Sequence, residues 1–255
     1  LGERLGGRCQ ILNFGVIGYG IDQAYLRYLQ DVRPWHPDLV IFSFINDDLR
    51  RAVSIYGFLE FPDGRFPFTK PRFLLKGNQL ELMTLPSALP RDTFASVSIH
   101  DLPSISHDVG YAPLQWDRAG WEWVTRSYVL RLLISLYPLH DRERPEVSRS
   151  ATMELNATLI LNLRQAILDD GAKALIVFLP DQHDLSHNVK EGLSLQLLRM
   201  IKIPYVNVAP CMKSSPIEGL FNPPSLGGHY SPKGNREAAN CLFQEVNSNL
   251  GERFS

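Results

Sequence analysis

The sequence predicts an α/β domain with three layers, in which helices cover both faces of a mostly parallel, doubly wound sheet. Two runs, residues 38–45 (DLVIFSFI) and 174–179 (ALIVFL), have the length of strands and are apolar almost throughout. Such runs are typical of strands buried on both faces, as in parallel sheets. Helical segments separate the predicted strands, and this alternation favours a parallel sheet. We expect both runs to be central strands.

The other elements are predicted from periodicity, turn residues and caps. Residues 10–14 (QILNF) form a short strand, and a glycine-rich turn and a helix over 21–32 follow it. Apolar residues at steps of three and four predict further helices, and Ser231 and Pro232 suit the N-cap and first position of the last one. These later elements are helices over 121–136, 153–167 and 189–200, a strand over 204–208, and a final helix to about Val246.

Residues 51–116 interrupt this alternation and are predicted to be an insertion in a single domain of residues 1–255. Two turn signals, PDG and KGN, indicate two hairpins in its first half. The expected strand pairs are 58–61 with 65–68, and 73–75 with 80–83. We expect the whole insertion to lie outside the main sheet.

Composition narrows the classes of function. The chain has 255 residues and a net charge of −1, which gives no electrostatic footprint for nucleic acid or an anionic membrane. No apolar run approaches the roughly 20 residues that a membrane-spanning helix needs. Cys9, Cys211 and Cys241 are far apart and odd in number, so three reduced or buried thiols are expected.

The first candidate site is the turn at residues 13–20 (NFGVIGYG). Its glycines allow a sharp turn and a close approach of the backbone to a ligand. One interpretation is a nucleotide-binding turn, but the glycine spacing is GxxGxG rather than GxGxxG, and no acidic residue ends the next strand. The other interpretation is a purely structural turn.

Asn46 and His229 are the second and third candidates. Asn46 follows the predicted strand 38–45, at the edge where open α/β sheets bind ligands. Its amide can donate a hydrogen bond to a developing oxyanion, or it can cap the next helical turn. His229 precedes the last predicted helix, whose dipole disfavours imidazolium and keeps the imidazole able to accept a proton. A loop histidine is also often structural.

A fourth cluster is the segment 181–187 (DQHDLSH), in which His183 and His187 are four residues apart and would suit a metal ion if they lay on a helix. Neither an HExxH motif nor a third ligand group accompanies them. Polar loop side chains exposed to solvent are therefore the favoured interpretation. No metal and no cofactor are expected.

Three segments, LNFGVIGYGIDQ, PDLVIFSFINDDLRR and GGHYSPKGNREAA, taken in this order, resemble bacterial members of the SGNH hydrolase superfamily, the GDSL-like lipases and esterases. The resemblance covers most of the chain and is weakest at 51–116. It implies a flavodoxin-like fold that hydrolyses acyl esters or O-acyl carbohydrates. It also implies that the Gly18 N–H and the Asn46 amide form the oxyanion hole, and that His229 is the base for a serine nucleophile.

The chain departs from the family pattern at several positions. It contains no Gly-Asp-Ser motif, so the family's first strand and its serine are expected about 20–30 residues before Leu1, the span of a strand and a helix. Leu226 stands three residues before His229, where the family usually has Asp, and Phe44 stands in place of a Gly.

Two alternatives to the esterase remain open. One is a non-catalytic SGNH-like protein that binds a ligand, and the less favoured one is a nucleotide-binding α/β protein. The expected partner is a small-molecule or carbohydrate ester, with no nucleic acid and no membrane span. A missing N-terminal segment favours an extracytoplasmic or membrane-associated location.

Overall fold

The computed structural model describes residues 2, 9–60, 68–85, 99–114, 120–137, 148–185, 192–214, 216–223 and 228–254, without the side chains of 122, 125, 244–245 and 247–254. The chain forms two compact units. Unit 1 comprises Leu1–Ala52 and Met153–Ser255, and unit 2 comprises Val53–Thr152. Unit 2 contains most of the predicted insertion and continues to Thr152.

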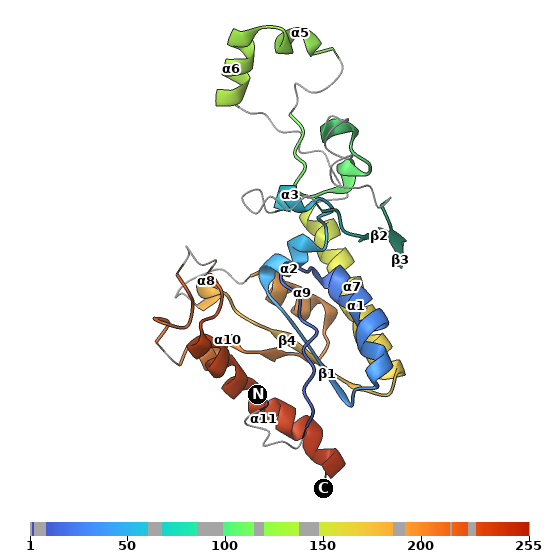
Figure 1. Ribbon diagram of the computed structural model, residues 1–255, viewed down its shortest axis with the longest axis vertical. Coiled ribbons are helices and arrows are strands. Elements are labelled where there is room, and N and C mark those ends of the chain that lie inside the picture. Colours follow the sequence, from blue (N-terminus) through green and yellow to red (C-terminus); the bar gives the residue numbers. More distant parts are fainter. Residues whose placement is uncertain are drawn as a thin grey trace. The chain divides into compact units, whose positions relative to one another are not determined.

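Unit 1 contains a sheet of three parallel strands in the order β1-β4-β5 (Figure 1). The strands are β1 (Leu39–Phe44), β4 (Lys173–Phe178) and β5 (Val206–Asn207). Helices and a parallel sheet confirm the α/β class. β4 is central as expected, because it pairs with both neighbours. β1 is an outer strand of the described sheet instead, because β4 is its only partner among the described strands.

The strand predicted at 10–14 is wrong, since these residues belong to no ladder in the described part of the chain. Ile11 and Leu12 are 49% and 41% exposed. An extended segment becomes a strand only through hydrogen bonds to a neighbouring strand, and here that neighbour is lacking among the described residues.

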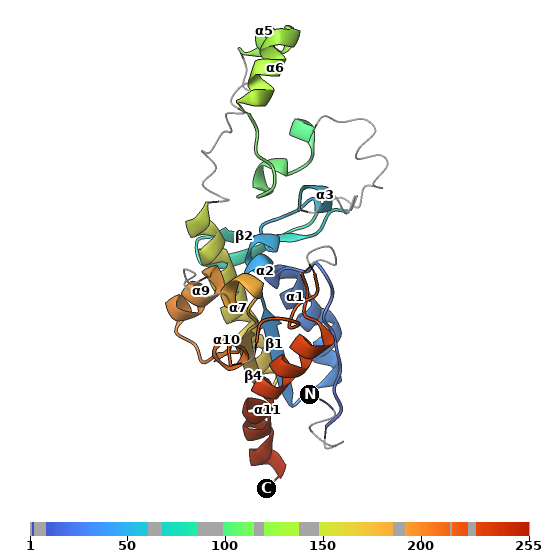
Figure 2. The ribbon, with the colours of Figure 1, turned by 90° about the vertical axis from the view of Figure 1, so that its left-hand side faces the viewer.

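Helices pack on both faces of the sheet, and alternate strand residues face them (Figures 1 and 2). Val40, Phe42 and Ala174 pack with Leu163 and Ile167 of α7 (Arg149–Asp169). The strand residues between them point to the other face of the sheet, where they pack against α10 (Ala209–Met212) and α11 (Pro232–Phe254). This face is turned toward the viewer in Figure 2. The strand residues of this second face are Leu39, Ile41, Leu175, Val177 and Val206. This period of two is what a strand buried on both sides requires.

The helices of unit 1 follow the predicted order. The helix expected over 21–32 is α1 (Ile21–Arg27), which continues as a π-helical turn, η1 (Tyr28–Val32). The predicted cap of the last helix is confirmed, because the Ser231 Oγ accepts a hydrogen bond from the Gly234 N–H at 3.1 Å. The remaining helices are η2 (Arg33–Trp35), α2 (Asn46–Arg51), α8 (Gln182–Leu185) and α9 (Leu193–Ile201).

Unit 2 has its own small core. Ile55 and Tyr56 pack with Leu102 and Ile105, and the buried Asp108 carboxylate accepts the Ile55 and Tyr56 N–H groups at 2.6 and 2.7 Å. A carboxylate without exposure is tolerated because these donors replace its water. The elements are α3 (Gly57–Glu60), β2 (Arg72–Lys76), β3 (Gln79–Met83), η3 (Ile99–Asp101), η4 (Ile105–His107), α5 (Glu122–Thr125) and α6 (Tyr128–Leu136).

One of the two predicted hairpins of unit 2 is confirmed. β2 and β3 are antiparallel with Lys76 opposite Gln79, so the two turn residues are those predicted. The prediction of the first hairpin is wrong, because Gly57–Glu60 form a helical turn. The N–H groups of Leu59 and Glu60 both donate to the Tyr56 carbonyl. Residues 61–67 lie outside the described part of the chain.

The helix predicted over 121–136 is two helices, α5 and α6, which meet at Arg126 and Ser127. The break has a local cause, since Ser127 is extended and caps α6 by accepting the Leu130 N–H at 3.4 Å. No helix in the described part of the chain combines the length and the apolar character that crossing a bilayer requires.

The cysteines differ from the expectation of three thiols. Cys211 of α10 and Cys241 of α11 form a disulfide, and Cys9 is free and half-buried. Sequence spacing did not indicate this pair, because the bond joins two helices that only the tertiary fold brings together. The Cα atoms lie 5.9 Å apart, within the range that a disulfide needs.

A polar cluster ties the end of α7 to η1 and η2 in unit 1. The Tyr28 hydroxyl and the Arg33 Nε both donate to Asp170 Oδ2 at 2.7 Å. These hydrogen bonds, that from Tyr28 above all, lower the pKa of Asp170 below its usual value.

We expect Asp170→Asn to lower the free energy of unfolding at pH 7, modestly because the carboxylate is exposed. Because the folded-state pKa lies below that of the unfolded chain, this stabilisation is present above about pH 4 and is lost as the pH falls through the folded pKa. Urea unfolding of both proteins from pH 7 down to about pH 2 measures the difference. Asp169→Asn is the control for charge, and a deficit that persists at the acidic end would contradict the prediction.

Candidate functional site

The candidate residues come from three segments of unit 1 near the carboxyl ends of β1 and β4. Asn46 starts α2 directly after β1. It does not cap this helix with its side chain, so that alternative is wrong. The cap is closed by Asp48, whose carboxylate accepts the Ile45 N–H at 3.0 Å and pairs with Arg51 at 2.7 Å. The Asn46 side chain is therefore left to make other contacts.

The Asn46 amide is held by α8 and by the start of α9. Its Nδ2 lies 3.0 and 2.9 Å from the two carboxylate oxygens of Asp184, and its Oδ1 accepts the Ser194 N–H at 3.0 Å. Gly192 passes so close that a Cβ there would lie 2.7 Å from the Asn46 amide. The half-buried amide is thus fixed in one orientation by contacts on both of its ends.

Asp184 was not expected to matter, because it belongs to the cluster interpreted as solvent-exposed polar residues. It is half-buried, and it exchanges two hydrogen bonds with Asp181. The Asp181 N–H donates to Asp184 Oδ2 at 3.0 Å, and the Asp184 N–H donates to Asp181 Oδ1 at 2.8 Å. Burial, with the nearby negative charge of Asp181, raises the pKa of Asp184, although the hydrogen bonds from the Asp181 backbone N–H and the Asn46 amide oppose the shift.

The described residues do not support a metal site at the cluster that contains His183 and His187. Among the residues that the structure describes, no group of three His, Cys, Asp or Glu could hold a metal ion. His183 is exposed on α8, and His187 lies outside the described residues.

Gly18 lies in a turn that requires glycine. Its φ is +77°, in the left-handed region that residues with a Cβ rarely adopt. The turn is further closed by the Tyr19 N–H, which donates to the Val16 carbonyl. Two residues on, Gly20 packs against the end of α2, where an added Cβ would lie 2.5 Å from the Ala52 nitrogen. The Gly18 turn therefore lies near the C-terminal end of α2, the helix whose first residue is Asn46.

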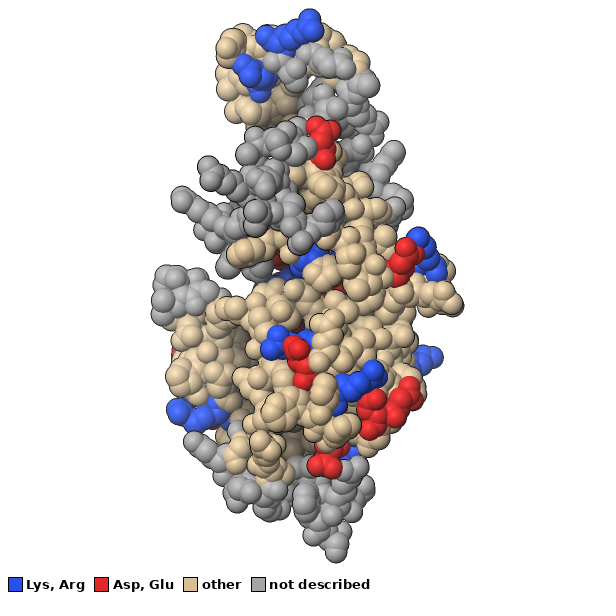
Figure 3. All heavy atoms as spheres, turned by 45° about the vertical axis from the view of Figure 1, so that its right-hand side comes forward, with Lys and Arg blue, Asp and Glu red and all other residues tan. Residues whose placement is uncertain are grey.

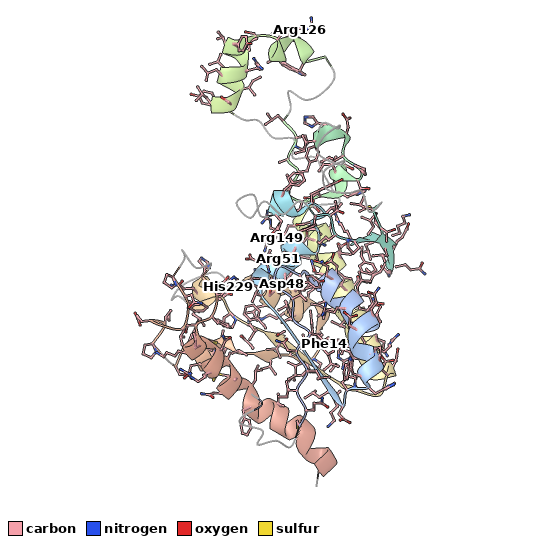
Figure 4. All side chains as sticks on the ribbon, in the orientation of Figure 1. Phe14, Asp48, Arg51, Arg126, Arg149 and His229 are labelled. Carbon is pink, nitrogen blue, oxygen red and sulfur yellow. A yellow bond between two sulfur atoms is a disulfide. The ribbon has the colours of Figure 1, made fainter. Side chains whose placement is uncertain are left out.

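His229 is tied to the carboxyl end of β4 through its neighbours. Its carbonyl accepts the Asn222 N–H at 2.7 Å, and the Tyr230 hydroxyl donates to the Pro180 carbonyl, which follows β4. Figure 4 shows His229 at the same end of the sheet as Asp48. The exposed His229 ring has no hydrogen-bond partner among the described residues, and Leu226 lies outside them.

Two aromatic residues of this region are buried or half-buried. Phe44 is 2% exposed and stacks on Phe42 with ring centroids 5.6 Å apart. Tyr230 is half-buried, and burial above all, with the charges of Asp181 and Asp184, raises its pKa. Its hydroxyl therefore remains protonated and keeps donating to the Pro180 carbonyl, which fixes the residue that follows His229.

Comparison with known proteins adds no relative: no family model, no curated protein and no solved structure matches this chain. Gly18, Asn46 and His229 are brought to one end of the sheet by three different elements, and Asp184 joins them as the partner of Asn46.

Proposed function

We propose that this domain is a carboxylic ester hydrolase of the SGNH type with a three-layer α/β/α fold. In this proposal the Gly18 N–H and the Asn46 amide stabilise the oxyanion, and His229 is the general base. The supporting observation is that these residues, from segments far apart in sequence, all lie at the carboxyl end of a parallel sheet, where ligands of α/β domains bind.

Acyl transfer requires a nucleophile, donors aimed at the oxyanion, and a base. The 255 residues contain no Gly-Asp-Ser motif, so this chain supplies the donors and the base only. The NH₂ group of Asn46 carries two protons. If one proton is shared between the two Asp184 oxygens, the other can donate to an acyl oxygen. Asp184 is then a positioning residue, which holds the amide of Asn46 in place.

The expected kinetic result is that this polypeptide hydrolyses p-nitrophenyl acetate no faster than residual catalysis allows, because triad sites without their nucleophile lose most of their activity. Initial rates against buffer measure this. Rapid hydrolysis that disappears in His229→Ala, but not in His183→Ala, would show that this chain contains a nucleophile of its own, contrary to the expected result. The exposed His183 on α8 is the matched control.

The binding test uses acetate, the product of such a reaction, as a probe of the oxyanion donors. Addition of sodium acetate, with sodium chloride at equal ionic strength as the control, should shift the amide resonance of Gly18 and the side-chain NH₂ resonances of Asn46. Asn46→Ala should weaken this binding by about tenfold or more, the low end for loss of one hydrogen bond to a charged group. Shifts confined to surface lysines and arginines would count against the proposal.

The Asn46–Asp184 contact favours one second candidate, a ligand-binding relative without catalysis. A carboxylate beside the amide disfavours a developing negative charge there unless Asp184 is protonated. The same titration separates the two candidates. Acetate that shifts Gly18 while the Asn46 NH₂ group stays bonded to Asp184 would support the ligand-binding protein.

A further inference from the structure

The α5–α6 segment, residues 120–137, carries a run of large apolar side chains on its surface. Their exposed fractions range from 38% to 83%. Contiguous apolar surface is uncommon on soluble proteins and marks a site of interaction. These residues are Trp121, Trp123, Tyr128, Val129, Leu132, Leu133, Leu136 and Tyr137.

The apolar and polar residues of α6 lie on separate sides of the helix. Ser127, Arg131 and Ser135 are four residues apart and form one polar line along it. With about 100° between successive residues, the exposed apolar positions from Tyr128 to Tyr137 cover about half of the circumference, opposite that line. A helix with a broad apolar face and a narrow polar line is typical of segments that lie in a membrane interface.

Aromatic residues flank the leucines of this face. Trp121 and Trp123 stack before α6 with ring centroids 5.9 Å apart, Tyr128 begins the helix, and Tyr137 follows it. Tryptophan and tyrosine prefer the level of the lipid headgroups, because each has an apolar body and a polar tip. Leucines between such residues are placed to enter the acyl region.

The charges of the segment fit a lipid surface. Arg126 and Arg131 oppose a single acidic residue, Glu122, so residues 120–137 have a net charge of two minus one, or +1. Basic side chains are visible on the described surface of α5 and α6 in Figure 3, and Figure 4 marks Arg126 there. The Arg131 guanidinium lies 4.4 Å from the Tyr128 ring centroid. Its side chain can extend along apolar surface and reach a phosphate.

We propose that residues 120–137 dock this protein onto the surface of a lipid bilayer, with α6 in the plane of the interface. The nine residues of α6 are about 14 Å long, far short of the roughly 30 Å hydrocarbon core, so the helix lies on the membrane rather than across it. The inference concerns unit 2 alone and stands or falls independently of the ester hydrolase.

Co-sedimentation of the full chain with vesicles tests this proposal. We expect binding to vesicles of phosphatidylcholine and phosphatidylglycerol, and weaker binding to phosphatidylcholine alone, because the arginines add attraction to anionic lipid. Leu132→Ser with Leu136→Ser should reduce the partition at least about tenfold, since these leucines leave water on docking. The matched control is Leu161→Ser with Leu168→Ser on α7, where the side chains are 42% and 38% exposed. It should bind as the wild type does.

Tryptophan fluorescence gives a second measurement that does not depend on sedimentation. Lipids brominated on their acyl chains should quench the emission, and Trp121→Phe with Trp123→Phe should lose most of that quenching. Circular dichroism checks that every variant is folded. The proposal is overturned if the wild type binds neither vesicle, or if both leucine pairs have equal effects. It is also overturned if the wild type is a dimer that the Leu132 and Leu136 changes dissociate, without any binding to vesicles.

Discussion

Replacing Cys211 and Cys241 together by serine is expected to lower the free energy of unfolding by about 3–4 kcal/mol. The bond closes a loop between residues separated by 30 positions, and the entropy of such a loop in the unfolded chain gives a value of this size. In the folded protein the bond joins α10 to α11, the two helices that cover one face of the sheet. Urea unfolding of the wild type and the double variant, both without reductant, measures the difference.

Cys9→Ser is the matched control, because Cys9 is free and packs beside the same hydrophobic cluster. It should change the stability by much less than the double variant does. Adding a reductant should bring the wild type to the stability of the double variant and leave that variant unchanged. If the native protein contains three titratable thiols and the double variant is as stable as the wild type, the disulfide does not form. Persistence of the bond would favour an oxidising compartment, where structural disulfides are common.

The parts of the fold that local patterns encode were predicted well. The continuous apolar run at 38–45 contains β1, and the Ser231-Pro232 pair begins α11 as a cap should. The KGN turn gave the correct pairing of β2 with β3. In the cap and the hairpin the decisive contacts lie within a few residues, and the apolar run of β1 itself encodes burial on both faces.

Predictions that needed a distant partner were less successful. Residues 10–14 have the composition of a strand but no partner strand in the described chain, and the apolar positions of 121–136 mark an exposed face rather than a buried one. Periodicity shows which residues share a side of an element, and it does not show what that side faces. The disulfide was missed for the same reason.

The candidate site divides in the same way. Gly18 was singled out by its glycine-rich turn, and its positive φ explains why glycine stands there. The contact of Asn46 with Asp184 joins residues 138 positions apart, and no spacing rule indicates it. A signal was available in the DQHD segment, where Asp181 and Asp184 have the spacing of a reciprocal helix cap. That spacing would have argued for ordered carboxylates rather than solvated ones.

Gly234→Ala is expected to destabilise the protein by about 2–3 kcal/mol, the upper part of the range for overpacking against atoms that cannot move aside. A Cβ at this position would lie 2.0 Å from the Leu220 carbonyl oxygen, which is backbone. That oxygen accepts the Ser231 N–H at 2.9 Å, and the Ser231 hydroxyl accepts the Gly234 N–H, so any shift loosens the start of α11.

The same shift should reach the candidate site, because Ser231 and Tyr230 hold the backbone next to His229. We therefore expect Gly234→Ala to shift the backbone amide resonance of His229 as well as to lower the urea midpoint. Asn235→Ala is the matched control in the same helical turn; its side chain is exposed, and alanine favours helix, so stability should stay equal or rise slightly. Equal stability of Gly234→Ala and the wild type would mean that α11 and the segment around Leu220 are not packed together as described.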